Sequence, residues 1–467
     1  MLRGKKVEVV PGLATRWRQT SPTTWVFDLR RGVKWHDGSD FTADDVVFSV
    51  LRAQGPTSGF RVYANALGTP RRIDSHTVEF TTAEPSPIVH EMASNIMIMS
   101  RAWAGRNKVE RSQDFTRSEE THAARNAMGT GPYRLVSHEP DVKTVFKKNP
   151  NWWGIAEGYF EGNVTDVVYT PLASDATRLA ALASGDLDFV LDPSPQDIER
   201  LRKDPGIRIY EIAENTVFFV AMDQHRGELL HSSVKGRNPL KDLRVRRAIY
   251  HAIDMDAIAR TALRGFGRAT AIVMPNPESV PVPPAMDKRL AHDPALARRL
   301  LAEAGYPNGF SVGMDCDLRW DKVCTALAGM LAKVGITLEL VVANSSTFFA
   351  KLRRLESSLY VSGWVGSQDA MFTLQPIYHS RDDNNGDWNI GNFRDPDLDA
   401  AIDRARVELD PAKRRELMIE AVRRMQEGIY MVPLYRRLAP WASRANVEVV
   451  QRPDMTFEAR WAKVKPR

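Results

Sequence analysis

The segment from Leu359 to Phe372 has the composition of a binding site for a small solute. A short apolar stretch ends there in a glycine-rich turn that carries Trp364, Ser367 and Asp369. An aromatic ring provides contact area, and a hydroxyl and a carboxylate fix orientation, which is the mixture that small-molecule pockets use. The same pattern also fits a core tryptophan beside an ordinary polar loop. Binding of a small solute is therefore the first hypothesis.

Motifs that would support catalysis or a cofactor are missing from the sequence. A zinc-binding helix that starts at His90 needs a second histidine where Ser94 stands. The turn at Gly366 lacks the flanking glycines of a nucleophile elbow. Pro132 follows the glycine-rich stretch 129–131, where a dinucleotide-binding loop would begin a helix. We predict no catalytic residue, no metal site and no cofactor, and hence a protein that is not an enzyme.

The chain has two cysteines, Cys316 and Cys324. Two cysteines are too few for a disulfide framework, and their spacing does not suit zinc. The first lies near the end of an expected strand and the second near the start of an expected helix. In an oxidising compartment they can form a disulfide. The alternative is two free thiols, one of them in the core, and spacing alone does not decide between the two.

Composition indicates a globular protein with more than one lobe. The chain has 467 residues, of which 43% are hydrophobic and 26% charged, so two or three lobes are expected. No apolar run reaches the roughly 20 residues of a membrane span. The net charge is +6, but the cations alternate with acids, as in 242–254. We therefore expect an arginine-rich surface and no nucleic-acid partner.

Hydrophobic periodicity predicts strands and helices in alternation, which is typical of an α/β fold. Trp25, Phe27 and Leu29 alternate with polar or smaller residues, and a second short strand is expected after Gly32. Thr42 is the expected N-cap of the helix that follows. Further strands are expected at 143–148, 164–170, 188–191 and 338–342, and further helices at 174–184, 294–304, 323–333 and 411–429.

Several motifs along the chain occur together in one known family. They include Pro-Gly-Leu-Ala-Thr-Arg-Trp at 11–17, the strand pair at 25–38, Gly-Thr-Gly-Pro-Tyr at 129–133 and Asn-Pro-Asn-Trp-Trp-Gly at 149–154. In this order they resemble the extracytoplasmic solute-binding proteins of peptide and nickel ABC importers, solute-binding family five, which includes dipeptide- and oligopeptide-binding proteins.

The resemblance implies a two-lobed periplasmic-binding-protein fold of type II, cluster C, with an extra subdomain on lobe one. Residues 1–130 would form the extra subdomain, 131–218 lobe one, 219–437 lobe two, and 438–467 the return to lobe one. In mature relatives, the counterpart of the motif at 11–17 lies much further from the first residue than it does in this chain. The resemblance therefore implies a late start, without a signal peptide and without the first strands of lobe one.

The implied function is the substrate-binding component of an ABC importer. Such a protein captures a short peptide or peptide-like solute between its lobes and delivers it to permease subunits at the membrane. The resemblance implies a monomer in the periplasm. Alternatives within the class are a receptor for a nickel chelate or for an opine- or sugar-like compound. An alternative of another class is a peptide hydrolase or amidase.

The resemblance also assigns site residues. Relatives place a Gly-Trp strand end, here Trp364, at the cleft between the lobes. Peptide-binding relatives have an aspartate for the ligand's amine three residues later, where this chain has Ser367. Either Asp369 replaces that aspartate, or the ligand presents no amine there. Arg319 corresponds to an arginine that grips the ligand's carboxylate, or else it is a solvated arginine beside Asp317 and Asp321.

Three further residues complete the expected set. Phe372 belongs to the same segment as Trp364, Tyr378 follows a helix-like stretch, and Phe219 lies near the expected crossing between lobes. Each is a candidate contact to the solute, with core packing as the alternative for Phe219. His379 is expected at the surface.

Overall fold

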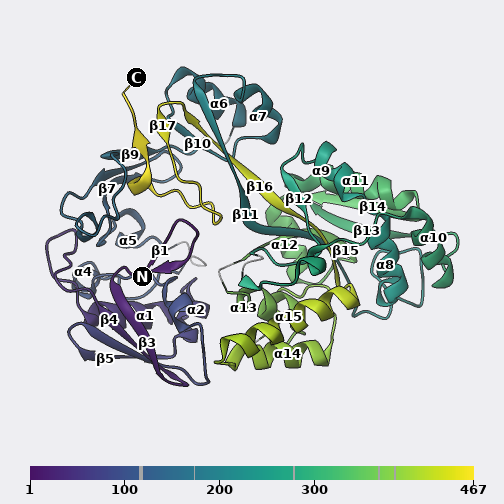
Figure 1. The fold of residues 1–467 in the computed structure, drawn as a ribbon, viewed down its shortest axis with the longest axis horizontal. Helices are drawn as coiled ribbons and strands as arrows, with labels where there is room; N and C mark the ends of the chain where they lie inside the picture. The colour runs from purple at the N-terminus through teal and green to yellow at the C-terminus, as the bar shows by residue number, and fades with distance from the viewer. Residues whose placement is uncertain (115–118, 173, 277–278, 367–368, 383–384, 467) are drawn as a thin grey trace. The chain divides into compact units, whose positions relative to one another are not determined.

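The structure is a computed structural model of residues 1–467 that describes all of them except 115–118, 173, 277–278, 367–368, 383–384 and 467. The chain divides into two compact units. The first unit comprises Met1–Ile212 and Pro440–Arg467, and the second comprises Ala213–Ala439. The chain passes between them within strand β11 (Ile207–Met222) and within strand β16 (Met431–Arg444), which are neighbours in one seven-stranded sheet (Figure 1).

The first unit contains a four-stranded antiparallel sheet in the order β3-β4-β6-β5. Its strands are β3 (Ala14–Ser21), β4 (Thr24–Leu29), β5 (Thr69–Asp74) and β6 (Thr77–Thr81). Helix α1 (Ala43–Ala53) begins after its N-cap Thr42, as predicted. The prediction of a short strand after Gly32 is wrong. The chain makes only one isolated bridge there, Lys34 to Asp40, because it turns at Gly32 and again at Gly38, both at positive φ.

The rest of the first unit consists of short elements. A three-stranded antiparallel sheet joins β7, β8 and β9, and β10 belongs to the seven-stranded sheet. The strands are β1 (Leu2–Arg3), β2 (Val9–Val10), β7 (Tyr133–Glu139), β8 (Lys143–Lys148), β9 (Asp166–Tyr169), β10 (Phe189–Leu191), β17 (Val447–Glu448) and β18 (Lys463–Val464). The helices are α2 (Arg61–Ala66), α3 (Val89–Ala93), α4 (Arg101–Arg106), α5 (His122–Arg125), α6 (Asp175–Ser184) and α7 (Pro195–Leu201).

The second unit is built on three parallel strands within the seven-stranded sheet. Strand β13 (Phe310–Asp317) lies between β14 (Ile336–Ala343) and β15 (Leu359–Val365) and is parallel to both, whereas β11 is antiparallel to β15. Strand β12 (Gly267–Ala269) pairs with β16. The α-helices are α8 (Leu243–Ala252), α9 (Met255–Thr261), α10 (Pro294–Glu303), α11 (Asp321–Ala332), α12 (Ser345–Arg353), α13 (Met371–Thr373), α14 (Pro396–Val407) and α15 (Pro411–Gly428).

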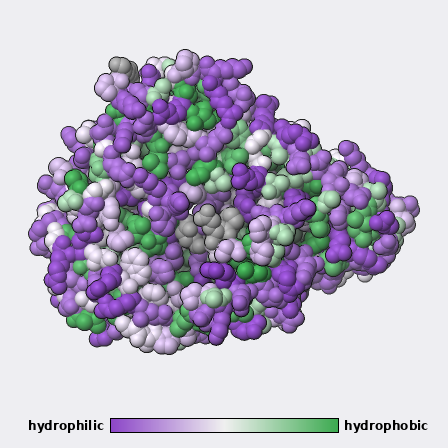
Figure 2. All heavy atoms as spheres, in the orientation of Figure 1, coloured by the Kyte–Doolittle hydropathy of each residue, from purple (hydrophilic) through white to green (hydrophobic). Residues whose placement is uncertain are grey.

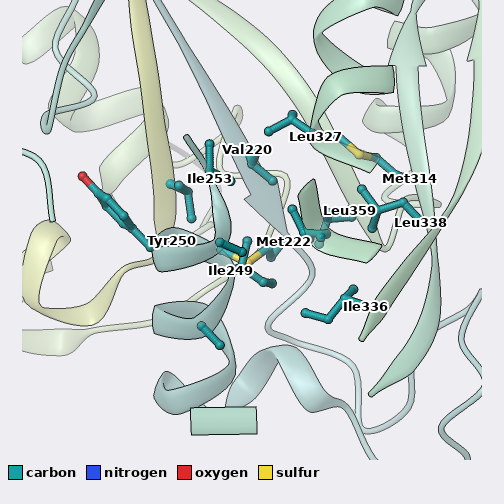
Figure 3. Packing of buried hydrophobic residues seen from close by; sticks show 14 of the residues in the cluster. Val220, Met222, Ile249, Tyr250, Ile253, Met314, Leu327, Ile336, Leu338 and Leu359 are labelled. Carbon is teal, nitrogen blue, oxygen red and sulfur yellow. The ribbon is translucent and has the colours of Figure 1, made fainter. Parts of the chain in front are cut away.

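The core of the second unit forms where helices α8, α10 and α11 bury their apolar faces against these strands. Figure 3 shows Ile249 of α8 beside Met222 of β11, and Leu327 of α11 beside Met314 of β13. Burial of apolar surface at this scale is the main stabilising term of such a unit. A disulfide joins Cys316, at the end of β13, to Cys324 in α11, and both cysteines are fully buried within the core.

The face seen in Figure 2 is mainly hydrophilic, and its hydrophobic residues gather in small separate patches. Among the described residues, no helix combines the length and the hydrophobicity needed to cross a bilayer. The mixed α/β class predicted from periodicity is confirmed. The separation of an extra subdomain, 1–130, from a lobe at 131–218 stays a prediction.

Candidate functional site

Strands β13, β14 and β15 all end at the same edge of the sheet, because they are parallel. We call this edge the carboxyl edge. In α/β sheets, ligands are held beyond the carboxyl ends of such strands, where loops carry side chains that are free to face a solute. Trp364 is the penultimate residue of β15, and Arg319 follows the end of β13 within two residues. The topology therefore brings both predicted residues to one edge.

Trp364 is held in place but is only partly buried. It is opposite Val217 in the β11–β15 ladder, and its indole Nε1–H donates a hydrogen bond to Thr373 Oγ1 at 3.2 Å. The turn after it depends on Gly366. A Cβ at this position would lie 2.7 Å from Cβ of Pro275, too close for any side chain. The glycine therefore allows the segment that contains Pro275 to pack against the end of β15.

Aromatic rings continue from Trp364 in an unbroken series of contacts, which we call the edge aromatic cluster. It runs from Trp364 to Trp388 (5.9 Å between ring centroids), Phe349 (6.2 Å), Phe348 (5.1 Å), Trp320 (6.0 Å) and Phe218 (5.3 Å). Rings at these separations attract one another beyond their area burial and hold each other in fixed orientations. Phe348 and Phe218 are buried, whereas the other four rings are partly exposed and give the carboxyl edge an apolar surface.

Arg319 lies at this surface with 58% of its side chain exposed. Its guanidinium already donates to Asp317, from Nε to Oδ1 at 3.0 Å and from Nη2 to Oδ2 at 2.8 Å, and it lies 5.0 Å from the ring centre of Trp320. Burial alone would raise the pKa of Asp317, but hydrogen bonds from Arg319 and Ser345 hold that pKa below its usual value. The aspartate thus orients a guanidinium whose remaining N–H groups are available to a ligand.

A second exposed guanidinium belongs to Arg353, at the end of α12. It lies 4.9 Å from the ring centre of Trp388, and no hydrogen bond or ion pair with a described residue occupies it. Neither Arg353 nor Trp388 is among the site residues predicted from the sequence. Both come from segments that carry no local binding signal, and contacts between distant parts of the chain, those of Trp388 with Phe349 and with Arg353 itself, bring them together.

Asp369 is already paired inside the protein. Both of its carboxylate oxygens accept hydrogen bonds from Arg414, at 2.7 and 2.8 Å, and Oδ1 also accepts from the backbone N–H of Met371. The side chains of Asp369 and Arg414 are only 13% and 10% exposed. The carboxylate is therefore anchored to helix α15. Ser367 lies outside the described residues.

The other predicted residues are placed as follows. Phe219 is buried in β11 and is opposite Ser362, and Phe372 is partly exposed. Tyr378 is fully buried, and its hydroxyl donates to the carbonyl of Val273 at 3.0 Å. It makes none of the ring contacts that define the edge aromatic cluster.

The surface position predicted for His379 is wrong, since only 5% of the residue is exposed. Asn389 explains the difference, because its amide donates a hydrogen bond to the carbonyl of His379 at 3.1 Å and draws this turn inward.

Within the described part of the chain, no group of three or more His, Cys, Asp or Glu side chains is arranged to hold a metal ion.

Comparison with known proteins places this geometry in a family. The chain is 27% identical over 454 residues to the dipeptide-binding protein of Escherichia coli K12, covering 89% of this chain and 78% of that protein. Its fold matches the periplasmic binding protein DppA of Helicobacter pylori in complex with a peptide (TM-score 0.78, 21% identity, 100% and 91% of the two chains covered). It also matches AgaA of A. tumefaciens R10 in complex with agropinic acid (TM-score 0.75, 23% identity, 100% and 92% covered).

These neighbours confirm the two-lobed solute-binding fold that the sequence motifs predicted. Residues 8–385 match the middle region of the bacterial extracellular solute-binding proteins, family 5, and this match spans most of the chain. The chain therefore belongs to the family 5 bacterial extracellular solute-binding proteins, a family with periplasmic substrate-binding components of ABC transporters among its members.

Proposed function

We propose that this chain binds a short peptide or peptide-like solute at the carboxyl edge and delivers it to the permease of an ABC importer. One observation carries the proposal: the edge aromatic cluster is flanked by two exposed guanidinium groups, those of Arg319 and Arg353. The rings offer contact area for apolar side chains, and a guanidinium matches a carboxylate through two parallel hydrogen bonds. Peptide-binding relatives in the same family support the choice of solute.

Recognition of the solute in this proposal does not require that an amine of the solute binds to the carboxylate of Asp369. Both oxygens of that carboxylate are engaged by Arg414, and an ammonium would have to share them with a guanidinium. A buried charge without its own partner is costly, so such sharing is unfavourable. The solute's carboxylate and apolar groups therefore provide most of the affinity.

The proposal extends to location and partners. The chain works in the periplasm, as its relatives do, and acts as a monomer without a nucleic-acid partner. It binds and releases its solute without chemical change. A metal chelate or an opine-like compound remains a second candidate, which is favoured by the missing amine partner and by the relative that was solved with agropinic acid.

The test is a calorimetric titration of the purified protein with four solutes: a dipeptide mixture, the same mixture N-acetylated, the same mixture with C-terminal amides, and nickel with histidine. We expect saturable binding of the dipeptides, a change within about threefold on acetylation, and a loss of at least about tenfold on amidation, equivalent to about 1.4 kcal/mol. Mass spectrometry should recover intact peptide. Tight binding of nickel–histidine without peptide binding, or hydrolysed peptide, would contradict the proposal.

A further inference from the structure

A cavity lies in the second unit. Its volume is about 290 Å³, and it opens between α8, the segments 271–273 and 285–290, α15 and the start of β16. No member of the edge aromatic cluster, and neither of its flanking arginines, lines it. Its wall includes two tyrosines and three methionines: Tyr250, Tyr378, Met286, Met425 and Met431.

The interior of this cavity is apolar because its polar wall groups are already bonded to the protein. The hydroxyl of Tyr378 donates to Val273, and the amide nitrogen of Gln426 donates to the carbonyls of Ala271 at 3.0 Å and Met286 at 2.7 Å. What faces the space is therefore mainly ring, thioether and aliphatic surface. Methionine side chains adapt to the shape of an apolar guest.

The mouth of the cavity is positively charged. Arg247 and Lys288 line it, both are exposed, and neither side chain forms a hydrogen bond or ion pair with a described residue. The lining carboxylate, Glu427, pairs instead with Arg423. Two cations without partners thus stand beside an apolar interior.

A third cation lies directly behind the wall. The guanidinium of Arg289 lies 4.6 Å from the ring centre of Tyr250. Its Nη1 donates to the carbonyls of Thr270 and Pro433, whereas its buried Nη2 has no hydrogen-bond partner among the described residues. Figure 3 shows the Tyr250 hydroxyl pointing away from the other labelled core residues. Burial lowers the pKa of Arg289, because removal from water disfavours its charged form. An anion bound nearby would offset this cost.

We propose that this cavity binds an amphipathic carboxylate, with the apolar body inside and the carboxylate between Arg247 and Lys288. The volume suits a body of roughly ten to fifteen non-hydrogen atoms, as in a medium-chain fatty acid. The interior provides apolar contact, and the charge at the mouth selects an anion over a neutral molecule of the same shape. This site is independent of the proposed function at the carboxyl edge.

The experiment is a calorimetric titration of the full chain with decanoate and with decanol. We expect decanoate to bind and decanol to bind at least about tenfold more weakly, equivalent to about 1.4 kcal/mol. The double substitution Arg247→Ala/Lys288→Ala should weaken decanoate by a similar factor. Lys413→Ala, which removes an exposed cation of α15 outside the lining, should not change its affinity. Met425→Trp, which fills the cavity, should abolish binding.

Any of three results would overturn the proposal. The unmodified chain does not bind decanoate, it binds decanoate and decanol with equal affinity, or the double variant and the Lys413→Ala variant bind decanoate with equal affinity. Since Met425→Trp changes a buried residue and can impair folding, the exposed double variant carries the test independently. Trp364→Leu should leave decanoate binding intact, so failure of the peptide site and failure of this site are distinguishable.

Discussion

Arg414 is the residue whose removal should destabilise the second unit most clearly. Arg414→Met keeps most of the side-chain volume but leaves the carboxylate of Asp369 without its two charge-assisted hydrogen bonds, and it also removes the bond from Nε to the carbonyl of Ala405 at 3.0 Å. Removing one partner of a fully buried ion pair costs about 3–5 kcal/mol. The exposures of 10% and 13% allow some solvation, so we expect about 2–4 kcal/mol.

The assay is urea denaturation followed by circular dichroism, with the free energy of unfolding extrapolated to water. Arg415→Met is the matched control, because Arg415 is the exposed neighbour on the same helix, and its effect should stay within about 0.5 kcal/mol. The double variant Asp369→Asn/Arg414→Met should recover part of the loss, because no charge is then stranded. Equal stability of the Arg414→Met and Arg415→Met variants would refute the reasoning.

Three further predictions concern stability. Replacing Cys316 and Cys324 by alanine should lower the free energy of unfolding by about 2–3 kcal/mol, because the disulfide closes a short loop. An unchanged midpoint of urea denaturation would contradict this prediction. The pKa of Asp317 is depressed in the folded state. The ionised carboxylate therefore stabilises the folded protein fully above the unfolded pKa of about 4, and this stabilisation is lost as pH falls through the folded pKa. The difference in melting temperature between wild type and Asp317→Asn should therefore become smaller on acidification, and a difference that does not change with pH would exclude this stabilising role of Asp317. Gly366→Ala should cost about 1–3 kcal/mol through steric overlap, whereas Gly329→Ala, where the new methyl meets open space, should not destabilise.

Elements with a strong local pattern could be predicted from the sequence. The strand expected at 143–148 is observed as Lys143–Lys148, and the helix expected at 411–429 is observed as Pro411–Gly428. The first contains Thr144, Val145 and Phe146, residue types that favour strands. The second begins at Pro411 directly after an N-cap aspartate. The family and its fold followed from motifs in a fixed order, and the comparisons confirm them.

The site was only partly predictable because its contacts join distant segments. The ring pair Phe349–Trp388 and the ion pair Asp369–Arg414 each join residues about forty positions apart, and no local periodicity reports such pairs. Trp364 could be found, because a glycine-flanked tryptophan at a strand end is a local signal. The engagement of Asp369 by Arg414 could not. The carboxylate looked available in the sequence and is not free in the structure.

The most direct test of the carboxyl edge as the binding site is a peptide titration of Trp364→Leu beside Trp17→Leu. Trp17 is also partly exposed but lies in β3 of the first unit. Loss of a ring that contacts the ligand should weaken binding by about tenfold to a hundredfold, equivalent to about 1.4–2.8 kcal/mol. We expect that loss for Trp364→Leu and an affinity within about twofold of wild type for Trp17→Leu. Unchanged peptide affinity in a correctly folded Trp364→Leu protein would contradict the account.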